Sequence, residues 1–174
     1  MELDLVALTI AHIEAENIHS VPATMDTISA DGAYYKVFSN NQTFTSRPDI
    51  SVFYGDTMDG IPDMHVAVEH MIVDKEKREV FAQYLFTGTH TGTFQDLPPT
   101  GKPIMYHGGI LYQFDENGKL TKEVQYFDKT EILASLGLIR DTNTTMGKFL
   151  LIFFQSPFYM IRAAFAMLFK KKKK

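Results

Sequence analysis

The sequence predicts an α+β fold, in which N-terminal helices cover the concave face of a strongly curved antiparallel sheet. Helical periodicity and helix-capping residues dominate positions 3–60, whereas period-two alternation dominates positions 64–127. Helices segregated from a run of strands are typical of α+β proteins. Glycines inside the long strands, such as Gly88 and Gly92, favour bends, so we expect the sheet to form a cone.

Three helices and one strand are expected in the N-terminal half. Residues 3–19 carry apolar side chains near helical spacing. A second helix is expected from Pro22, since proline fits the first helical turn, and a third after Ser46, a residue type that caps helix N-termini. Residues 33–38 are aromatic and β-branched, which predicts a strand.

Four strands and a short helix are expected after Pro62. The strands cover residues 64–73, 78–94, 103–114 and 120–127. Asn117-Gly118, between the last two, is the strongest short hairpin signal. Residues 129–137 predict a short helix that Gly137 ends.

Composition restricts the class of protein. The chain has 174 residues, of which 45% are hydrophobic and 22% charged, which suits one globular domain. It has no cysteine, which excludes a disulfide framework, a thiolate metal site and a cysteine nucleophile. Residues 1–148 carry 11 basic and 21 acidic side chains, which argues against a nucleic-acid partner. The acidic N-terminus does not resemble a secretory signal, so we expect a cytoplasmic protein.

The C-terminal segment differs in composition from the rest. We expect a cone domain of residues 1–140, followed by an apolar, lysine-terminated helical tail of residues 141–174. Residues 149–174 contain an apolar run long enough to span a bilayer, but Pro157 and Arg162 oppose a spanning helix. The alternatives are a peripheral helix whose lysines contact anionic lipid, a tail anchor, and a helix packed on protein.

Four pieces of sequence carry a resemblance to a known family. They are IPDMHVAVEHMIVD (61–74), FTGTHTGTFQDLPPTGKPI (86–104), LYQFDENGKLTKEVQYFD (111–128) and ILASLGL (132–138). Together they resemble the SnoaL-like polyketide cyclases and related ester cyclases, in the nuclear-transport-factor-2-like superfamily. The usual tryptophan of the last strand is missing, and Val124 stands near its place.

The resemblance implies a cone with an apolar cavity, a homodimer, and a cofactor-independent acid–base catalyst of the cyclase or isomerase type. Its ligand would be a small hydrophobic carbonyl compound. In such chemistry an aspartate at the end of the last strand removes a proton, and Asp128 matches that position. The alternative function is non-catalytic binding of a hydrophobic ligand, and a third is a structural role in oligomerisation. Fold alone does not decide among them.

Asp128, His107 and His90 are the candidate catalytic residues. Asp128 is either a base or the N-cap of the next helix, with Glu131 completing a capping box. A two-residue loop at Asn117-Gly118 places Asp128 opposite His107 and predicts a His–Asp dyad, whereas a three-residue loop places Tyr106 there. His90 is expected to point inward, either as a core histidine or as a group that polarises a substrate carbonyl.

The ligand cavity is expected to be lined by aromatic side chains. The candidates are Tyr34, Phe53, Tyr84, Tyr106 and Tyr126. We expect neither a cofactor nor a metal site. His65 and His70 lie five residues apart on one strand and should therefore face opposite sides.

Overall fold

The computed structural model describes residues 3–139 and 144–149. The chain divides into two compact units, residues 1–136 and 137–174. The helices of the first unit are α1 (Leu5–Asn17), α2 (Val21–Thr27), α3 (Arg47–Gly60) and α4 (Lys129–Ser135), with a short 3-10 helix η1 (Phe38–Asn40). Its strands are β1 (Tyr34–Val37), β2 (Gln42–Phe44), β3 (His65–Asp74), β4 (Glu79–Thr89), β5 (Pro103–Phe114) and β6 (Leu120–Phe127). The predicted α+β class is confirmed.

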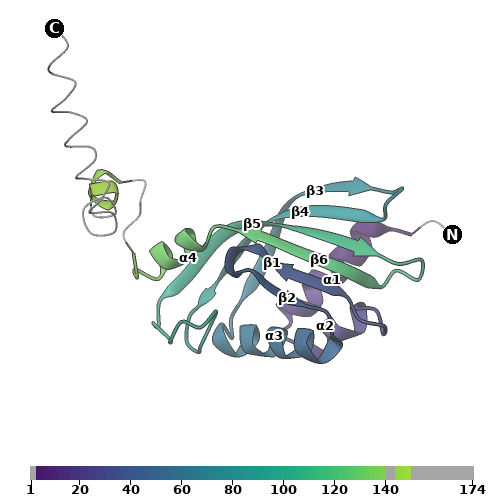
Figure 1. Cartoon of the computed structure of the whole chain (residues 1–174), viewed down its shortest axis with the longest axis horizontal. Helices are drawn as coiled ribbons and strands as arrows, with labels where there is room; N and C mark the ends of the chain where they lie inside the picture. The colour runs from purple at the N-terminus through teal and green to yellow at the C-terminus, as the bar shows by residue number, and fades with distance from the viewer. Residues whose placement is uncertain (1–2, 140–143, 150–174) are drawn as a thin grey trace, which may run out of the picture. The chain divides into compact units, whose positions relative to one another are not determined.

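The strands form one six-stranded sheet in the order β2-β1-β6-β5-β4-β3. The sheet is mixed rather than purely antiparallel, because β1 runs parallel to β6. It curves around α1, α2 and α3 but does not close, since β2 and β3 remain edge strands (Figure 1). The edge strand β2 was not expected from the sequence. It forms because Asn41, at a φ of 58°, reverses the chain after η1 so that β2 returns along β1.

Side-chain caps fix where the helices begin. Ser46 accepts a hydrogen bond from the Asp49 amide, which confirms Ser46 as the N-cap of α3. Ser20 caps α2 in the same way, with Pro22 in the first turn. Gly137 follows α4 with a φ of 66°, as expected for a residue that ends a helix.

A β-bulge between Val68 and His70 changes the pattern predicted for β3. Beyond the bulge the alternation is shifted, so Ile72 is 61% exposed while Met71 packs on the core. Unbroken alternation along the expected strand of residues 64–73 would place Ile72 on the inner face with Val66, and the bulge moves it to the outer face. The expectation that His65 and His70 face opposite sides is wrong for the same reason. They pair with Thr87 and Gln83 of β4, which lie four residues apart and therefore share one face, and both histidines are exposed.

Most of the β5–β6 ladder has the register that a two-residue loop predicts, but next to the turn Phe114 pairs with Leu120, which is the three-residue register, and an irregularity at Gln113–Phe114 separates the two. Gly108 pairs with Phe127, and the pairing continues in step to Gln113 and Lys122. The alternative, three-residue register is excluded over this stretch. β6 ends at Phe127, so Asp128 is the first residue beyond the ladder.

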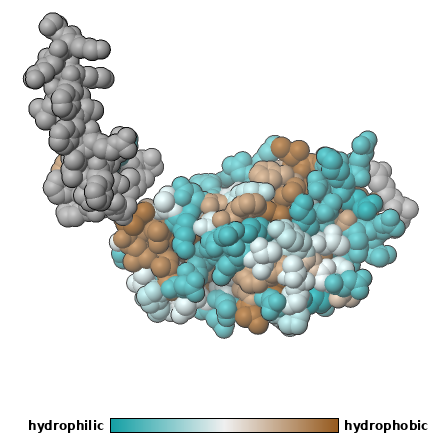
Figure 2. Space-filling model, viewed as in Figure 1, coloured by the Kyte–Doolittle hydropathy of each residue, from teal (hydrophilic) through white to brown (hydrophobic). Residues whose placement is uncertain are grey.

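The two faces of the sheet differ in polarity. The inner face contributes buried aromatic and aliphatic side chains to a single core with the helices. The outer face mixes polar residues with exposed hydrophobic ones, which appear as neighbouring teal and brown areas in Figure 2. Phe38 and Tyr126, for example, stack on each other and remain about half exposed.

The expected helical tail falls largely outside the described residues. In the ranges 3–139 and 144–149, no helix has both the length and the apolar character required to cross a membrane.

Candidate active site

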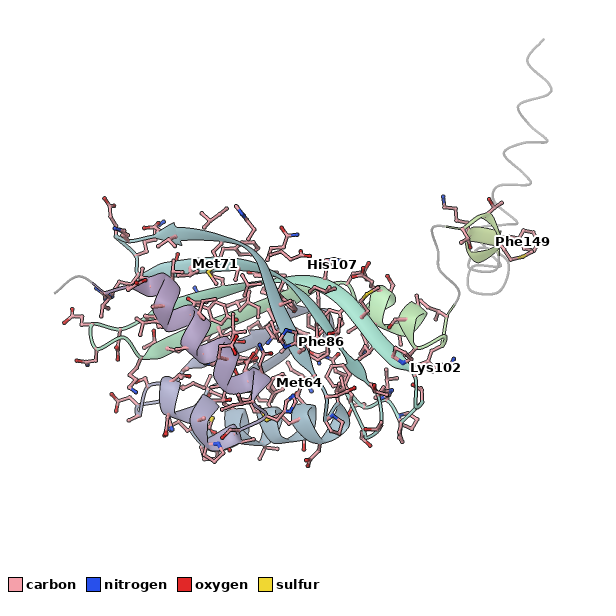
Figure 3. The ribbon with its side chains drawn as sticks, turned by 180° about the vertical axis from the view of Figure 1, so that it is seen from behind. Met64, Met71, Phe86, Lys102, His107 and Phe149 are labelled. Atoms are coloured by element: carbon pink, nitrogen blue, oxygen red, sulfur yellow. The ribbon has the colours of Figure 1, made fainter. Side chains whose placement is uncertain are left out.

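A small cavity lies between the helices and the inner face of the sheet. Its volume is about 40 Å³, which accommodates a few water molecules or one end of a ligand. It is lined by Glu16, Phe53, Tyr54, Thr57, Met64, Val66, Tyr84, Phe86, Phe94, Gln95, Tyr106, Ile110 and Gln125. Figure 3 shows Met64 and Phe86 between the helices and the strands. Most of this lining is apolar, and within the described ranges Glu16 is its one carboxylic acid.

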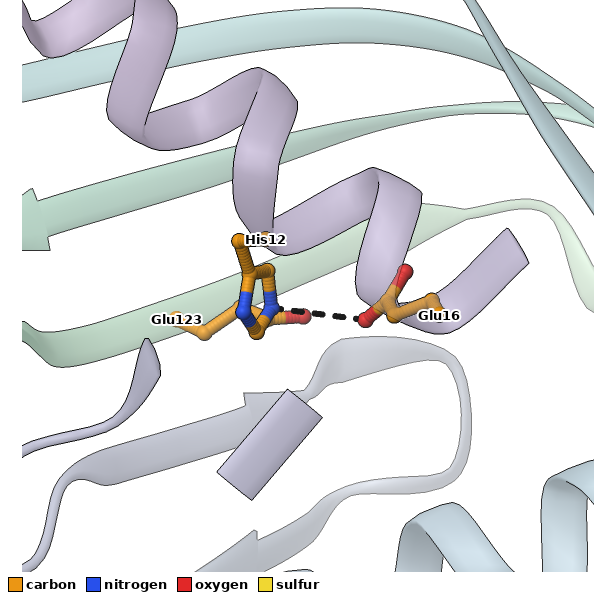
Figure 4. A group of neighbouring side chains, drawn as sticks. All are labelled: His12, Glu16 and Glu123. Carbon is orange, nitrogen blue, oxygen red and sulfur yellow. Dashed lines mark hydrogen bonds and ion pairs between the residues drawn. The ribbon is translucent and has the colours of Figure 1, made fainter. Parts of the chain in front are cut away.

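Glu16 belongs to a buried cluster with His12 and Glu123 (Figure 4). His12 and Glu16 lie one turn apart on α1, and Glu123 points inward from β6. The Nε2 atom of His12 is 3.4 Å from Glu16 Oε1 and 3.2 Å from Glu123 Oε2. At most 4% of any of the three residues is exposed to solvent.

Hydrogen bonds establish which atoms of His12 carry protons. The Thr27 hydroxyl donates to the Thr24 carbonyl at 2.6 Å, so its oxygen can only accept from His12 Nδ1. The Tyr54 hydroxyl donates to Glu123 at 3.1 Å, so its oxygen also acts as an acceptor toward His12. Both ring nitrogens of His12 therefore face acceptors, which requires a doubly protonated, positively charged imidazole.

The electrostatics of the site agree with this assignment. Burial alone lowers the pKa of His12, but hydrogen bonds and charge attraction from Glu123 and Glu16 outweigh it and raise the pKa to about 10. The imidazolium is therefore charged throughout the physiological pH range.

Glu16 is the member of the cluster that can exchange a proton with a ligand. Burial raises the pKa of Glu16, and the negative charge of Glu123 raises it further, while His12 opposes both effects. One imidazolium and two carboxylates carry a net charge of −1, and protonation of Glu16 neutralises them. Of the three side chains only Glu16 lines the cavity. A buried carboxyl group with a raised pKa is a suitable general acid or base.

Polar neighbours hold Glu123 in place. Its Oε1 atom accepts from the Gln125 amide at 3.0 Å, and its Oε2 atom accepts from Tyr54. Gln125 also donates to the Tyr35 hydroxyl. The carboxylate is thus fully engaged with protein groups and is not free to act on a ligand.

The same cluster is the one group in the described ranges that could hold a metal ion, since its ligand atoms lie within 4.8 Å of one another. One imidazole and two carboxylates resemble ligand sets for zinc or iron. A metal ion would have to displace the Nε2 proton of His12 before it could bind. Without an ion, the hydrogen-bonded cluster has the geometry of a proton-transfer site.

Two phenols that hydrogen-bond each other can supply a donor to a ligand in the cavity. Tyr84 and Tyr106 both line it, and burial raises the pKa of each phenol, so both stay neutral. Tyr84 lies over Gly108, where a side chain would collide with its hydroxyl at 2.4 Å. This glycine leaves the space that the phenol occupies.

The structure places Asp128 as the N-cap of α4. Its Oδ1 atom accepts from the Thr130 amide at 2.8 Å and from the Thr130 hydroxyl at 2.7 Å. These bonds lower the pKa of Asp128, and the side chain is exposed and outside the cavity lining. A lowered pKa weakens a base, so the geometry corresponds to the capping alternative.

His107 lies on the outer face of the sheet, because it is exposed while its strand neighbour Tyr106 is buried, and it is absent from the cavity lining. Its ring nitrogens are 3.7 Å from Glu69 and 3.5 Å from Glu131, and half of its side chain is exposed. The expected dyad with Asp128 is not formed among the described residues. The register was as expected, but the first residue beyond β6 turns into the helix and Glu131 takes the place beside the imidazole.

His90 is fully buried, in keeping with the expected inward orientation. Its Nδ1 atom is 3.2 Å from the Thr100 hydroxyl, and its ring lies edge-on to Phe94. It does not line the cavity, and its Nε2 atom has no hydrogen-bond partner in the described part of the chain.

The predicted aromatic residues separate into two groups. Phe53, Tyr84 and Tyr106 line the cavity, as expected. Tyr34 and Tyr126 are each 44% exposed and absent from its lining. The reason is strand alternation, which turns the neighbouring Tyr35 inward and Tyr34 outward.

His12, Glu16 and Glu123 were not singled out from the sequence. The spacing of His12 and Glu16 was a usable signal, because residues four apart share one helix face and His12 falls among apolar positions. Glu123 gave no such signal, since the inward positions of β6 next to it are Thr121 and Gln125, which are polar.

Comparisons with known proteins agree with this architecture. The family profile described as SnoaL-like polyketide cyclase matches residues 7–136. No curated protein matches the chain.

Solved structures show the same fold at low sequence identity. AclR from Streptomyces galilaeus, a proposed hydroxylase, has 20% identity and a TM-score of 0.68, over 81% of this chain and 89% of its own. IdmH from Streptomyces antibioticus, a proposed polyketide cyclase, has 20% identity and a TM-score of 0.64, over 78% and 99%. A protein with a ketosteroid isomerase-like fold from Catenulispora acidiphila has 20% identity and a TM-score of 0.63, over 79% and 95%.

Proposed function

Because the chain belongs to the SnoaL-like polyketide cyclase family, we propose that it catalyses a cofactor-independent acid–base reaction on a small hydrophobic carbonyl compound. The observation that carries the proposal is the position of Glu16. It is the acid that lines the apolar cavity, and it stands next to a buried imidazolium.

In the proposed reaction, ionised Glu16 removes a proton from the carbon next to the carbonyl group. The negative charge that develops on the carbonyl oxygen is stabilised by the neutral phenols of Tyr84 and Tyr106. Glu16 then returns the proton to another carbon in an isomerisation. In a cyclisation the enolate carbon attacks a second carbonyl carbon, and protonated Glu16 gives its proton to the alkoxide oxygen that forms. His12 and Glu123 act as positioning residues.

The test is hydrogen–deuterium exchange at the α-carbon of 2-tetralone and cyclohexanone in D₂O, followed by proton NMR. We expect the wild-type protein to accelerate exchange over buffer, and Glu16→Gln to lower that acceleration by about 10²-fold or more. Glu14→Gln is the matched control, because Glu14 is an exposed residue of the same helix. Its exchange rate should equal that of the wild type.

Asp128 is the second candidate base, favoured by its match to the family position. Asparagine also caps helices well, so Asp128→Asn should fold normally. Loss of exchange in Asp128→Asn, with full activity in Glu16→Gln, would move the base to Asp128 and restore His107 and His90 as candidates. Binding of the ketone without any acceleration by the wild type would instead favour a non-catalytic carrier.

A further inference from the structure

The buried cluster of His12, Glu16 and Glu123 has the spacing of a tetrahedral metal site. Ligands that bind zinc at about 2.0–2.1 Å lie about 3.3 Å from one another, because the edge of a tetrahedron is about 1.6 times its centre-to-corner length. The Nε2 atom of His12 is 3.4 Å from Glu16 Oε1 and 3.2 Å from Glu123 Oε2. The ligand atoms of all three side chains lie within 4.8 Å of one another. An ion can therefore replace the Nε2 proton with little movement of these side chains.

The hydroxyl oxygen of Tyr54 stands where a fourth ligand would lie. It is 3.2 Å from His12 Nε2 and 3.1 Å from Glu123 Oε2, and it also interacts with Glu16. Imidazole nitrogen and carboxylate oxygen are common zinc ligands, and an oxygen that carries hydrogen often completes the fourth position. The four atoms together approximate the corners of one tetrahedron.

The charge of the cluster favours a divalent ion. One imidazolium and two carboxylates carry a net charge of −1, in a region where at most 4% of any of the three residues is exposed. A divalent ion bound to a neutral imidazole and the same two carboxylates gives a net charge of zero. Because uncompensated charge is costly in a buried site, this exchange offsets part of the cost of removing the proton.

The cavity gives an ion a route to the cluster. Phe53 and Thr57 of α3 line the cavity and are also partly exposed to solvent, so only one layer of side chains separates it from the surface. Glu16 and Tyr54 line it as well, whereas His12 does not. An ion that enters the cavity therefore reaches Glu16 and Tyr54 first.

We propose that His12, Glu16 and Glu123 bind one zinc ion, with the Tyr54 hydroxyl in the fourth position. On binding, the Nε2 proton of His12 passes to solvent, and the nitrogen lone pair coordinates the ion. Zinc then inhibits the proposed reaction, because Glu16 is bound to the metal and cannot accept a proton. Only this inhibition rests on the proposed function. Magnesium and calcium are poor matches, since both prefer six or more oxygen ligands.

The direct test is titration of the full, ¹⁵N-labelled chain with zinc, followed by NMR spectra of the histidine ring nitrogens. These spectra distinguish protonated, neutral and metal-bound nitrogen, and the chain has six histidines. We expect one equivalent of zinc to move the Nε2 signal of His12 to the metal-bound position and to leave the other five histidines unchanged. Magnesium should move none of them. Changes at the other histidines alone, or no change at all, would overturn the inference.

Matched variants identify the ligands through the zinc dissociation constant, measured by competition with a coloured chelator. Glu16→Gln and Glu123→Gln should each weaken zinc binding about tenfold or more. His107→Gln is the control. His107 also lies between two glutamates, but they contact different ring nitrogens, so one ion cannot bridge all three side chains. Wild-type affinity in both glutamate variants, with the fold checked by circular dichroism, would contradict the assignment.

Cobalt reports the coordination number, because four-coordinate Co²⁺ absorbs visible light far more strongly than six-coordinate Co²⁺. We expect strong absorption in the wild type and an altered spectrum in Tyr54→Phe, which removes the fourth oxygen. Weak absorption of the six-coordinate kind in the wild type would refute a tetrahedral site.

The outcomes separate this inference from the proposed function. Zinc should suppress ketone exchange, and EDTA should restore it. Zinc binding to a protein that exchanges no ketone protons would refute the catalysis and retain the metal site. Exchange that persists in the zinc-bound protein would retain the metal site and refute Glu16 as the base. Exchange in a protein that binds no zinc would refute the metal site alone.

Discussion

His12 and Glu16 face each other across one turn of α1, with 3.4 Å between the imidazole Nε2 and a carboxylate oxygen, in a region that excludes solvent. Helix α1 therefore packs on the sheet and also carries two side chains of the candidate site. It brings an imidazolium to a carboxyl group that the cavity exposes, and β6 supplies the second carboxylate.

His12→Ala should strongly destabilise the fold. Removal of one partner from a buried charged group leaves the others uncompensated, at a cost of about 3–5 kcal/mol. The free energy of unfolding in urea measures the effect. His65→Ala is the control, because His65 is exposed, and its change should stay within about 0.5 kcal/mol. A similar result for both variants would argue against a charged His12.

Stability should fall as the pH rises from 6.5 to 9.5. In the unfolded chain His12 releases its proton near pH 6.5, whereas the folded protein keeps it until about pH 10. The folded state therefore binds more protons in this interval, and stability declines by at most about 1.4 kcal/mol per pH unit. The raised pKa of Glu16 also makes stability fall with rising pH, beginning at its ordinary value of 4.5. Urea midpoints across this range should show the decline in the wild type and a flatter profile in His12→Gln.

Glu123→Gln should shift the pH dependence of ketone exchange to lower pH. The negative charge of Glu123 contributes to the raised pKa of Glu16, so its removal lowers that pKa. The pH midpoint of the exchange rate reports the change, which a purely structural role of Glu123 would not produce. A lower rate with an unmoved midpoint would contradict the electrostatic coupling.

Gly92→Ala should destabilise the protein, because the new methyl group would stand 2.5 Å from the Asp59 carbonyl oxygen. Gly55→Ala is the matched control on α3. A methyl group on Gly55 would have no other atom within 4 Å, so we expect a gain of roughly 0.5–1 kcal/mol from helix propensity. Thermal unfolding of the two variants should therefore change in opposite directions.

Residues 149–174 should bind anionic membranes through their lysines. Replacement of the five terminal lysines by glutamine should abolish flotation with vesicles rich in phosphatidylserine, at about 1 kcal/mol lost per lysine. Vesicles of phosphatidylcholine alone provide the control. Equal flotation of both proteins with both vesicles would favour insertion by the apolar run, and no flotation at all would favour packing on protein.

Much of the fold follows from local patterns in the sequence. Ser46 and Pro22 mark helix starts, and Asn117-Gly118 marks the turn between β5 and β6, because capping and turn preferences depend on a few neighbouring residues. The register of most of that ladder depends on an irregularity at Gln113–Phe114, which the turn residues do not specify. The bulge near Glu69 and the short strand β2 were not predicted, because both depend on how these residues pair with a neighbouring strand rather than on local sequence.

The site was harder to predict than the fold. Asp128 has the sequence context of both a cap and a base, and only the bonds to Thr130 show which geometry it adopts. His12 and Glu123 are 111 residues apart, and no local rule connects them. Phe53, Tyr84 and Tyr106 could be chosen because aromatic residues on inward faces tend to line cavities.

The parallel pairing of β1 with β6 has a consequence for how the chain assembles. During synthesis β1 leaves the ribosome roughly ninety residues before its central neighbour, so it has only the short β2 to pair with until β6 arrives. The same late strand delivers Glu123 to His12. The charge on His12 in the N-terminal helix α1 is therefore matched by Glu123 only after the last strand of the domain has been synthesised.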